Sequence, residues 1–250
     1  MKDELTTRRF SDLAEISLRQ GRYTFTTFLT EAECSDFYSI RNTLPNVGVA
    51  IFGGYENAER VMLRFGDAES LGWEEPFPIS CIRISPLSMK FADDLSHRDV
   101  LGAVMHLGIE RSEIGDILIS DKEAYLFCTQ TMAEYLCREL NKVRHTSVRC
   151  TITEELPQSI TQARKEGEIQ IASERIDAVI AKIYRISRSD CLELFQRPLV
   201  FVNSRNMESG SHLLKEGDKV SVRGYGKFRF LGIIGETRKG NKIAKYEQYI

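Results

Sequence analysis

The sequence contains no stretch of about eighteen consecutive apolar residues, the length that a membrane-spanning helix requires. The charged N-terminal segment MKDELTTRRFSDLAEISLRQG is not followed by an apolar run. It therefore does not resemble a secretory signal peptide, and its pattern predicts a helix instead. These absences predict a cytoplasmic protein that does not contact a membrane.

A pattern of paired or metal-binding cysteines is also lacking. The chain has 6 cysteines, but no two of them form C-x-x-C and none stands at metal-ligand spacing with a histidine. A chain of 250 residues that is 42% hydrophobic can build an ordinary core, which makes disulfide staples unnecessary. We therefore expect reduced, mostly buried thiols, no metal and no cofactor.

The signatures of enzymes that act on nucleotides are missing too. No G-x-G-x-x-G or G-x-x-x-x-G-K loop follows a predicted strand, which argues against a methyltransferase or an NTPase. The tripeptide His97-Arg98-Asp99 is typical of a kinase catalytic loop, but the glycine-rich loop, the V-A-I-K strand and the D-F-G motif are absent. We expect no catalytic residues and interpret Asp99 as a helix-capping residue.

The charge of the chain is unevenly distributed. The net charge is −2, from 34 basic and 36 acidic residues. Residues 173–250 carry 15 Lys and Arg against 9 Asp and Glu, a charge of +6, whereas residues 1–172 carry 19 against 27, a charge of −8. A basic segment on an acidic body favours one docking orientation on RNA, although scatter in composition is an alternative explanation.

The order of the predicted helices and strands divides the chain into pieces and makes the fold α+β. Residues 1–73 form a small α/β unit. Residues 74–155 follow the order βαββαβ, which is typical of a ferredoxin-like unit of the RNA-recognition type. Residues 156–172 are expected to be a linker that contains a short strand-like segment, Ile169–Ile171. Residues 173–250 are expected to form a C-terminal unit that ends in a hairpin.

The C-terminal unit is predicted to begin with two short helices. An apolar stripe from Ile176 to Ile183 has helical spacing, and Ser187-Arg188-Ser189-Asp190 is a capping box that starts the second helix. Free amides at a helix N-terminus, together with guanidinium groups, form an anion site suited to RNA phosphates. The residues that we expect to bind RNA are Arg175, Lys182, Arg185, Ser187, Arg188, Ser189, Arg223, Lys227 and Arg229.

The last three of these residues lie on predicted strands and would extend the basic surface of the helix pair. For any single residue of the set, an ordinary solvated face is the alternative explanation. The set as a whole, next to a capped helix start, favours phosphate binding.

The same C-terminal segment resembles a known domain. The run SERIDAVIAKIYRISRSDCLELF, followed by VFVNS and EGDKVSVRGYGKFRF, is similar to the alpha-L RNA-binding domain of the small-subunit ribosomal protein S-four, some pseudouridine synthases and tyrosyl-tRNA synthetases. Two departures are visible, at Gln196-Arg197-Pro198 and at Ser204. Both alter turns rather than the basic face, so the resemblance implies a C-terminal RNA-binding domain.

Two upstream segments are similar to the YlmH family of bacterial RNA-binding proteins, which carry an alpha-L domain at the C-terminus. They are FGGYENAERV, from Phe52, and SHRDVLGAVMHLGIERSEIGDILI, from Ser96. With them, the resemblance spans nearly the whole chain. It implies rRNA and tRNA as partners, by analogy on the large ribosomal subunit during rescue or quality control of stalled complexes. It also implies a link to cell division, with a protein of the division machinery as a further partner.

A second group of RNA-binding candidates lies outside the helix pair. Arg98 and Arg111 flank the most distinctive part of the YlmH-like segment that begins at Ser96, and His97 stands beside Arg98 at a predicted helix start. Tyr125 and Phe127 share one strand face, where aromatic rings either stack on bases or pack in a core. The group is His97, Arg98, Arg111, Tyr125, Phe127 and, in the terminal hairpin, Lys239 and Lys242.

The leading hypothesis is a non-enzymatic protein that grips structured RNA through its C-terminal basic face. Two alternatives remain. An RNA-modifying enzyme could use the alpha-L domain for substrate delivery, although the pseudouridine-synthase-like Glu174-Arg175-Ile176-Asp177 lies inside the alpha-L segment. A scaffold linked to cell division could use the acidic body as its docking surface.

Overall fold

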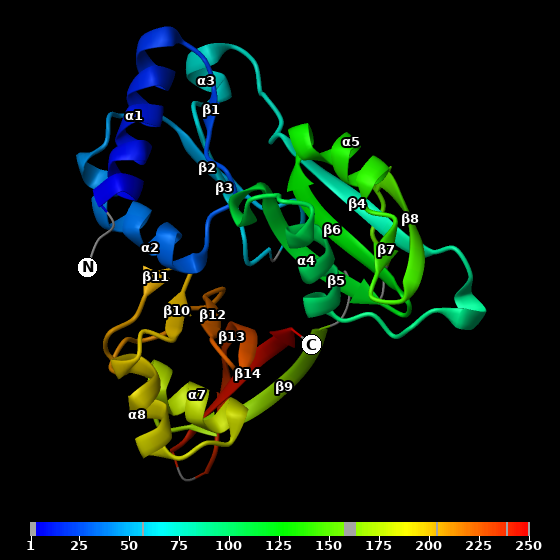
Figure 1. Ribbon diagram of the computed structural model, residues 1–250. Coiled ribbons are helices and arrows are strands. Elements are labelled where there is room, and N and C mark those ends of the chain that lie inside the picture. The colour runs from blue at the N-terminus through cyan, green and yellow to red at the C-terminus, as the bar shows by residue number, and fades with distance from the viewer. Residues whose placement is uncertain (1–3, 57, 158–163, 204, 239, 250) are drawn as a thin grey trace. The chain divides into compact units, whose positions relative to one another are not determined.

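The computed structural model describes residues 4–249 except 57, 158–163, 204 and 239 (Figure 1). It contains two compact units, Met1–Gln162 and Ala163–Ile250. Helices and antiparallel sheets occur in both units, so the predicted α+β fold class is confirmed.

The N-terminal part of the first unit is a three-stranded antiparallel sheet with the order β1-β3-β2, against which two helices pack. Its core includes Phe37, whose ring meets Phe10 at 5.7 Å and Phe65 at 6.1 Å, both edge to face. Thr30 and Glu33, which form the T-x-x-E pattern of a capping box in the sequence, start the second helix with both hydrogen bonds of the box present. The elements are α1 (Glu4–Gln20), β1 (Thr24–Phe25), α2 (Glu31–Ile40), a 3-10 turn (Arg41–Thr43), β2 (Val49–Phe52), β3 (Met62–Phe65) and α3 (Ala68–Leu71).

The middle part of the first unit is a five-stranded antiparallel sheet with the order β5-β6-β4-β8-β7. Its four long strands have the order of a ferredoxin-like βαββαβ unit, as predicted. Val100 and Val104 of α4 and Leu136 of α5 share a core with the strands, so both helices cover one sheet face. The elements are β4 (Ile79–Pro86), 3-10 turns (Met89–Phe91, Arg111–Glu113), α4 (His97–His106), β5 (Ile114–Ser120), β6 (Glu123–Thr129), α5 (Gln130–Glu139), β7 (Lys142–Val143) and β8 (Thr146–Thr153).

The N-terminal and middle parts share a small core, although the sequence predicted separate pieces. Phe28 and Met62 pack against Phe127 on the sheet face that α4 and α5 leave open. Tyr55 stacks on Phe127 with ring centroids 5.1 Å apart. Gly54 has a φ of +98°, and a Cβ there would lie 2.3 Å from the Phe127 ring, so only glycine fits this turn. Contacts between distant segments cannot be read from local periodicity, which explains the difference.

The second unit is a six-stranded antiparallel sheet with the order β11-β10-β12-β13-β14-β9. Two helices cover one face of this sheet, and the buried stripe Ile176, Val179, Ile180 and Ile183 lies in their shared core, as predicted. The elements are β9 (Arg164–Ile171), α7 (Ile176–Tyr184), α8 (Arg188–Gln196), β10 (Val200–Val202), β11 (Arg205–Asn206), β12 (Lys219–Val222), β13 (Gly226–Glu236) and β14 (Lys242–Tyr249).

The predicted linker, residues 156–172, is corrected in its second half, where the strand is longer than the predicted Ile169–Ile171. Strand β9 occupies Arg164–Ile171 and pairs with β14 along its whole length, from Arg164↔Tyr249 to Ile171↔Lys242. The sequence RKEGEIQI contains only two apolar residues, so its composition is that of a linker. The backbone of β14 supplies the pairing that makes it a strand, and charged side chains suit an edge strand because they discourage further pairing.

The cysteines are free thiols, and most of them are buried. Burial is the main cause that raises the pKa of Cys34, Cys128 and Cys150 to about 12. These thiols remain protonated at neutral pH and act as small core residues. No helix in the part of the chain that the structure describes has the length and apolarity to cross a bilayer. Its His, Cys, Asp and Glu side chains form no cluster of three or more that could hold a metal ion.

Candidate RNA-binding surface

The connection between α7 and α8 is a tight corner of three residues. Helix α7 ends at Tyr184, and its C-cap residue is Arg185, whose backbone is left-handed with φ 55° and ψ 42°. Its N–H donates to the carbonyl of Ala181, which also accepts from Ile186 N at 3.1 Å. Ser187 then caps α8, because its Oγ accepts from Asp190 N at 3.1 Å. One of the two hydrogen bonds of the predicted capping box, the bond from Asp190 N to the Ser187 hydroxyl, is thus present.

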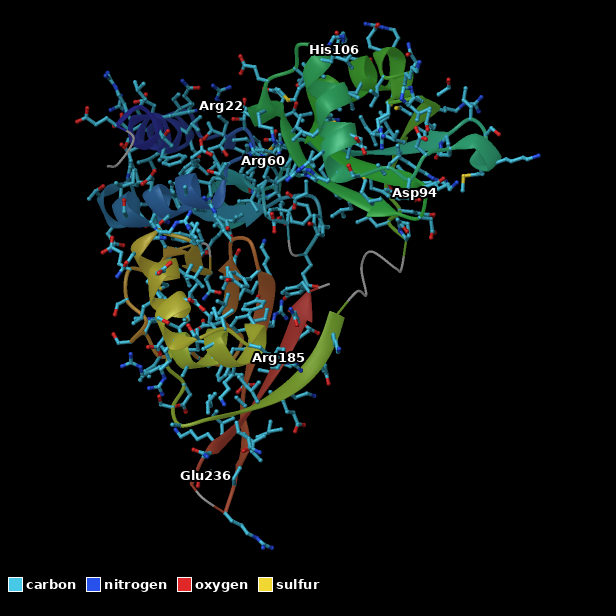
Figure 2. All side chains as sticks on the ribbon, turned by 60° about the horizontal axis from the view of Figure 1, so that its bottom comes forward. Arg22, Arg60, Asp94, His106, Arg185 and Glu236 are labelled. Atoms are coloured by element: carbon cyan, nitrogen blue, oxygen red, sulfur yellow. The ribbon has the colours of Figure 1, made fainter. Side chains whose placement is uncertain are left out.

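The corner carries five of the predicted RNA-binding residues, all of them exposed: Lys182, Arg185, Ser187, Arg188 and Ser189. We call these five residues the corner surface; Figure 2 labels Arg185. Among the described residues, the side chains of Lys182 and Arg185 have neither a hydrogen bond nor an ion pair. The Oγ atoms of Ser187 and Ser189 are 2.8 Å apart. Cations without protein partners beside a helix N-terminus are available to bind an anion.

Arg175 differs from the prediction, because it lies before α7 rather than on one of its faces. Its Nε and Nη2 atoms donate to the two carboxylate oxygens of Asp177 at 3.1 and 2.6 Å. Hydrogen bonding by this guanidinium lowers the pKa of Asp177. The positive charge of Arg175 is therefore locally neutralised, which makes it a weaker phosphate ligand than the arginines of the corner surface.

The three predicted residues of the strands do not extend the corner surface. Lys227 and Arg229 alternate along β13 with phenylalanines that face α7 and α8, so they point to the opposite face of the sheet. Arg223 stands over the ring of Phe201, with Cζ 4.9 Å from the centroid, and Phe201 also lies outside the helix-side core. The prediction of one continuous basic surface is thus corrected to two faces, because side chains alternate along a strand.

The aromatic pair of the middle sheet is buried. Phe127 is 2% exposed and Tyr125 is 4% exposed. Phe127 lies under Tyr55 and beside Phe28, and the Tyr125 hydroxyl donates to Glu123 Oε2 at 3.2 Å. Core packing, the alternative given by the sequence, therefore describes Phe127, and its ring is not available to stack on a base.

Of the remaining RNA-binding candidates, Arg111 and Lys242 are bonded to groups of the protein itself. Arg111 donates through Nη1 to the carbonyls of Ile114 and Gly115 at 2.5 and 3.2 Å, which assigns it a structural role. Lys242 donates to both carboxylate oxygens of Glu174 at 2.8 and 3.0 Å. Lys239 lies outside the described residues.

His97 and Arg98 are exposed in the first turn of α4. A complete capping box closes this helix start, because Ser96 Oγ accepts from Asp99 N and the Asp99 carboxylate accepts from Ser96 N at 3.0 Å. The hydrogen bonds from Ser96 lower the pKa of Asp99, as expected for a capping carboxylate. An anion at this helix start would meet the negative charge of Asp99, and Asp190 holds the equivalent position in the first turn of α8, so these carboxylates do not distinguish the two helix starts.

A buried polar network that the sequence did not predict joins the two parts of the first unit. Asp116, 7% exposed, accepts hydrogen bonds from Tyr55 Oη at 2.8 Å, Glu59 N at 2.6 Å and Arg60 N at 3.1 Å. Arg60, labelled in Figure 2, donates to the carbonyls of Phe28, Arg111 and Ile114. An irregular register in β5 between Ile114 and Ile117 surrounds Asp116. An aspartate inside the apolar strand IGDILIS was the available signal.

Replacing Arg185 with glycine is expected to raise the free energy of unfolding by about 0.5–1 kcal/mol, because glycine adopts the left-handed conformation without a Cβ clash. Urea unfolding followed by circular dichroism measures the change. Arg185→Ala keeps the Cβ and should give no gain. Equal stability of the two variants would contradict the view that the backbone of Arg185 is strained.

This chain is similar in sequence to a known domain family and to a known bacterial protein. Residues 73–156 match the family described as a putative RNA-binding domain in YlmH, which agrees with the RNA-recognition type of unit predicted for the middle part. This match, and the relative described next, agree with the resemblance to the YlmH family that the two upstream segments predicted. It is 29% identical, over 99% of its length and 96% of the relative, to the ribosome-associated protein quality control protein P2 of Bacillus subtilis.

A solved structure, the cell division protein YlmH from Streptococcus pneumoniae, is also similar. It shares 20% identity with this chain, with a TM-score of 0.49, and the match covers 64% of this chain and 93% of that one.

Proposed function

We propose that this protein is a non-enzymatic RNA-binding protein of the cytoplasm that associates with the ribosome and holds structured rRNA or tRNA through its corner surface. The observation that carries the proposal is the exposure of Lys182 and Arg185, without ion-pair partners among the described residues, beside the capped start of α8. Guanidinium groups bind phosphates with two parallel hydrogen bonds, and the helix dipole favours the same charge.

The relatives support the ribosome as the place of action. The Bacillus subtilis relative, which is similar over nearly the whole chain, is named as ribosome-associated and as acting in protein quality control. We extend this to the present chain, with rRNA or tRNA on the large subunit of stalled complexes as its RNA. The division-linked protein partner predicted from the family stays a prediction.

The chemistry of the chain supports a binding rather than a catalytic role. Burial raises the pKa of the Cys81 thiol to about 12 and that of Cys191 to about 11, so neither is a thiolate nucleophile at neutral pH. Asp116, the most buried described carboxylate, is occupied by three donors from its own unit.

Cosedimentation tests the proposal. The full-length protein and its Arg185→Ala/Arg188→Ala variant are spun with ribosomes, separated subunits and free tRNA across a salt series. We expect the variant to bind at least about tenfold more weakly, because two charge-assisted contacts are worth roughly 1.5–3 kcal/mol each. Binding of the wild-type protein should fall as salt rises.

A matched control removes two other exposed arginines. Arg8→Ala/Arg9→Ala on α1 changes the net charge equally on a different surface, and it should bind as the wild-type protein does. Undiminished binding by a folded Arg185→Ala/Arg188→Ala variant would refute the corner surface as the RNA site.

A further inference from the structure

The first unit contains an open groove that the RNA-binding proposal does not use. Its volume is about 670 Å³, and it lies between the end of β2 and the open sheet face beside α5. The apolar residues that line it come from both parts of the unit: Phe52, Phe77, Ile79, Phe127, Ile152 and Leu156. Two of them remain strongly exposed, Phe52 at 41% and Ile152 at 54%. Contiguous exposed apolar side chains mark interaction sites more often than single ones do.

Carboxylates stand among the apolar residues that line the groove. Glu74, Glu134 and Glu154 line it, and all three are exposed. Within the described lining the only cation is Arg64, whose Nη2 pairs with Glu74 at 3.1 Å while its Nη1 donates to the Glu75 carbonyl. The lining is therefore negative as well as apolar, and the phosphates of an RNA would be repelled by it.

Arg64 also shapes the wall of the groove. It is 7% exposed, and its Cζ lies 4.9 Å from the centroid of Tyr23 and 5.2 Å from that of Phe77. Its Nε–H is covered by protein and has no acceptor among the described residues. A buried donor without an acceptor is unfavourable, and a carbonyl oxygen of a bound chain that reached this N–H would supply the missing acceptor.

The end of β2 offers backbone groups next to the groove. This strand, Val49–Phe52, pairs with β3 on one side and has no strand on its other side among the described residues. An edge strand is a template for an added extended segment, whose alternate side chains then enter neighbouring pockets.

We propose that this groove is a docking site for an extended, basic and apolar peptide segment of a partner protein. The apolar side chains of the segment pack on Phe52, Phe77 and Ile152, and its Lys or Arg side chains pair with Glu134 and Glu154. Charge complementarity selects this occupant over RNA, and the groove is thus a protein contact distinct from the corner surface.

Peptide binding to the full-length protein tests the assignment. The probe is a fluorescein-labelled synthetic peptide that alternates Lys with Leu and Phe, followed by anisotropy, and its partner peptide has Glu in place of each Lys. Trp73, the single tryptophan of the chain, contacts Tyr23 at 5.8 Å and reports whether binding occurs beside Arg64. We expect saturable, salt-sensitive binding of the basic peptide, a change in Trp73 emission and no binding of the acidic peptide.

Two double variants that change the net charge equally show where the peptide binds. Glu134→Lys/Glu154→Lys should weaken the basic peptide at least about tenfold, because two attractive pairs become repulsive. Asp94→Lys/Glu110→Lys, on exposed positions of the same unit outside the groove, should not. Equal weakening by both pairs, no binding of the basic peptide, unchanged Trp73 emission, or displacement of the peptide by oligouridine would each overturn the proposal.

Discussion

Asp116→Ala is expected to lower the free energy of unfolding of the first unit by about 3 kcal/mol or more. The alanine leaves the amides of Glu59 and Arg60 and the hydroxyl of Tyr55 without their acceptor in a buried site. It also removes the negative charge beside Arg60, which is itself largely enclosed by carbonyl oxygens. Both parts of the unit depend on this network, so they should lose stability together.

Urea unfolding at 25 °C, followed by circular dichroism, measures the loss. Asp67→Ala is a suitable comparison, because Asp67 accepts from Ser70 N at 2.7 Å and Gly48 N at 3.2 Å in a more solvated position. As a helix cap of α3 it should cost about 1 kcal/mol. A loss for Asp116→Ala no larger than that for Asp67→Ala would show that the two parts do not depend on the buried carboxylate.

The local features of this fold follow closely from the sequence. The capping boxes at Thr30 and Ser96 mark the starts of α2 and α4, and the stripe from Ile176 to Ile183 marks α7. These patterns depend on hydrogen bonds and contacts within a few residues, which local sequence determines. The order βαββαβ then restricts the middle sheet to few topologies.

The features that the sequence did not predict all depend on distant partners. Strand β9 extends over eight residues because β14, about seventy residues later, supplies the edge with which it pairs. Core packing of Phe127 was one of two explanations that the sequence allowed, and the residues that cover its ring, Phe28 and Tyr55, lie far away in the sequence. Asp116 is satisfied by donors more than fifty positions earlier. Local periodicity carries no information about such pairs.

The candidate site shows the same division. Lys182, Arg185 and Arg188 could be placed together because they belong to one local corner between two capped helices. Lys227 and Arg229 could be placed on one strand face but not relative to those helices, because this depends on which face of the sheet the helices cover. Sequence therefore predicts clusters within a local motif better than surfaces that combine several motifs.

Reversing the charge of the corner is expected to have the largest effect on RNA binding. The variant Lys182→Glu/Arg185→Glu/Arg188→Glu should bind a tRNA transcript about 10²–10³-fold more weakly at roughly 0.1 M salt, because three attractive contacts become repulsive. The plot of log K against log salt should also become shallower, by about 0.7–0.9 for each phosphate that the protein no longer neutralises. Filter binding across a salt series gives both quantities.

The comparison variant Arg8→Glu/Arg9→Glu/Arg22→Glu changes the net charge by the same amount at three exposed positions of the first unit. If the overall charge of the protein determined its affinity for RNA, both triple variants would bind RNA equally weakly and the corner surface would have no special role. Local contacts instead predict a steep fall in affinity for the corner variant and a small fall for the comparison variant.

The variant Arg185→Gly separates RNA binding from folding. It should weaken RNA binding while it stabilises the fold, a combination that a general loss of structure cannot produce.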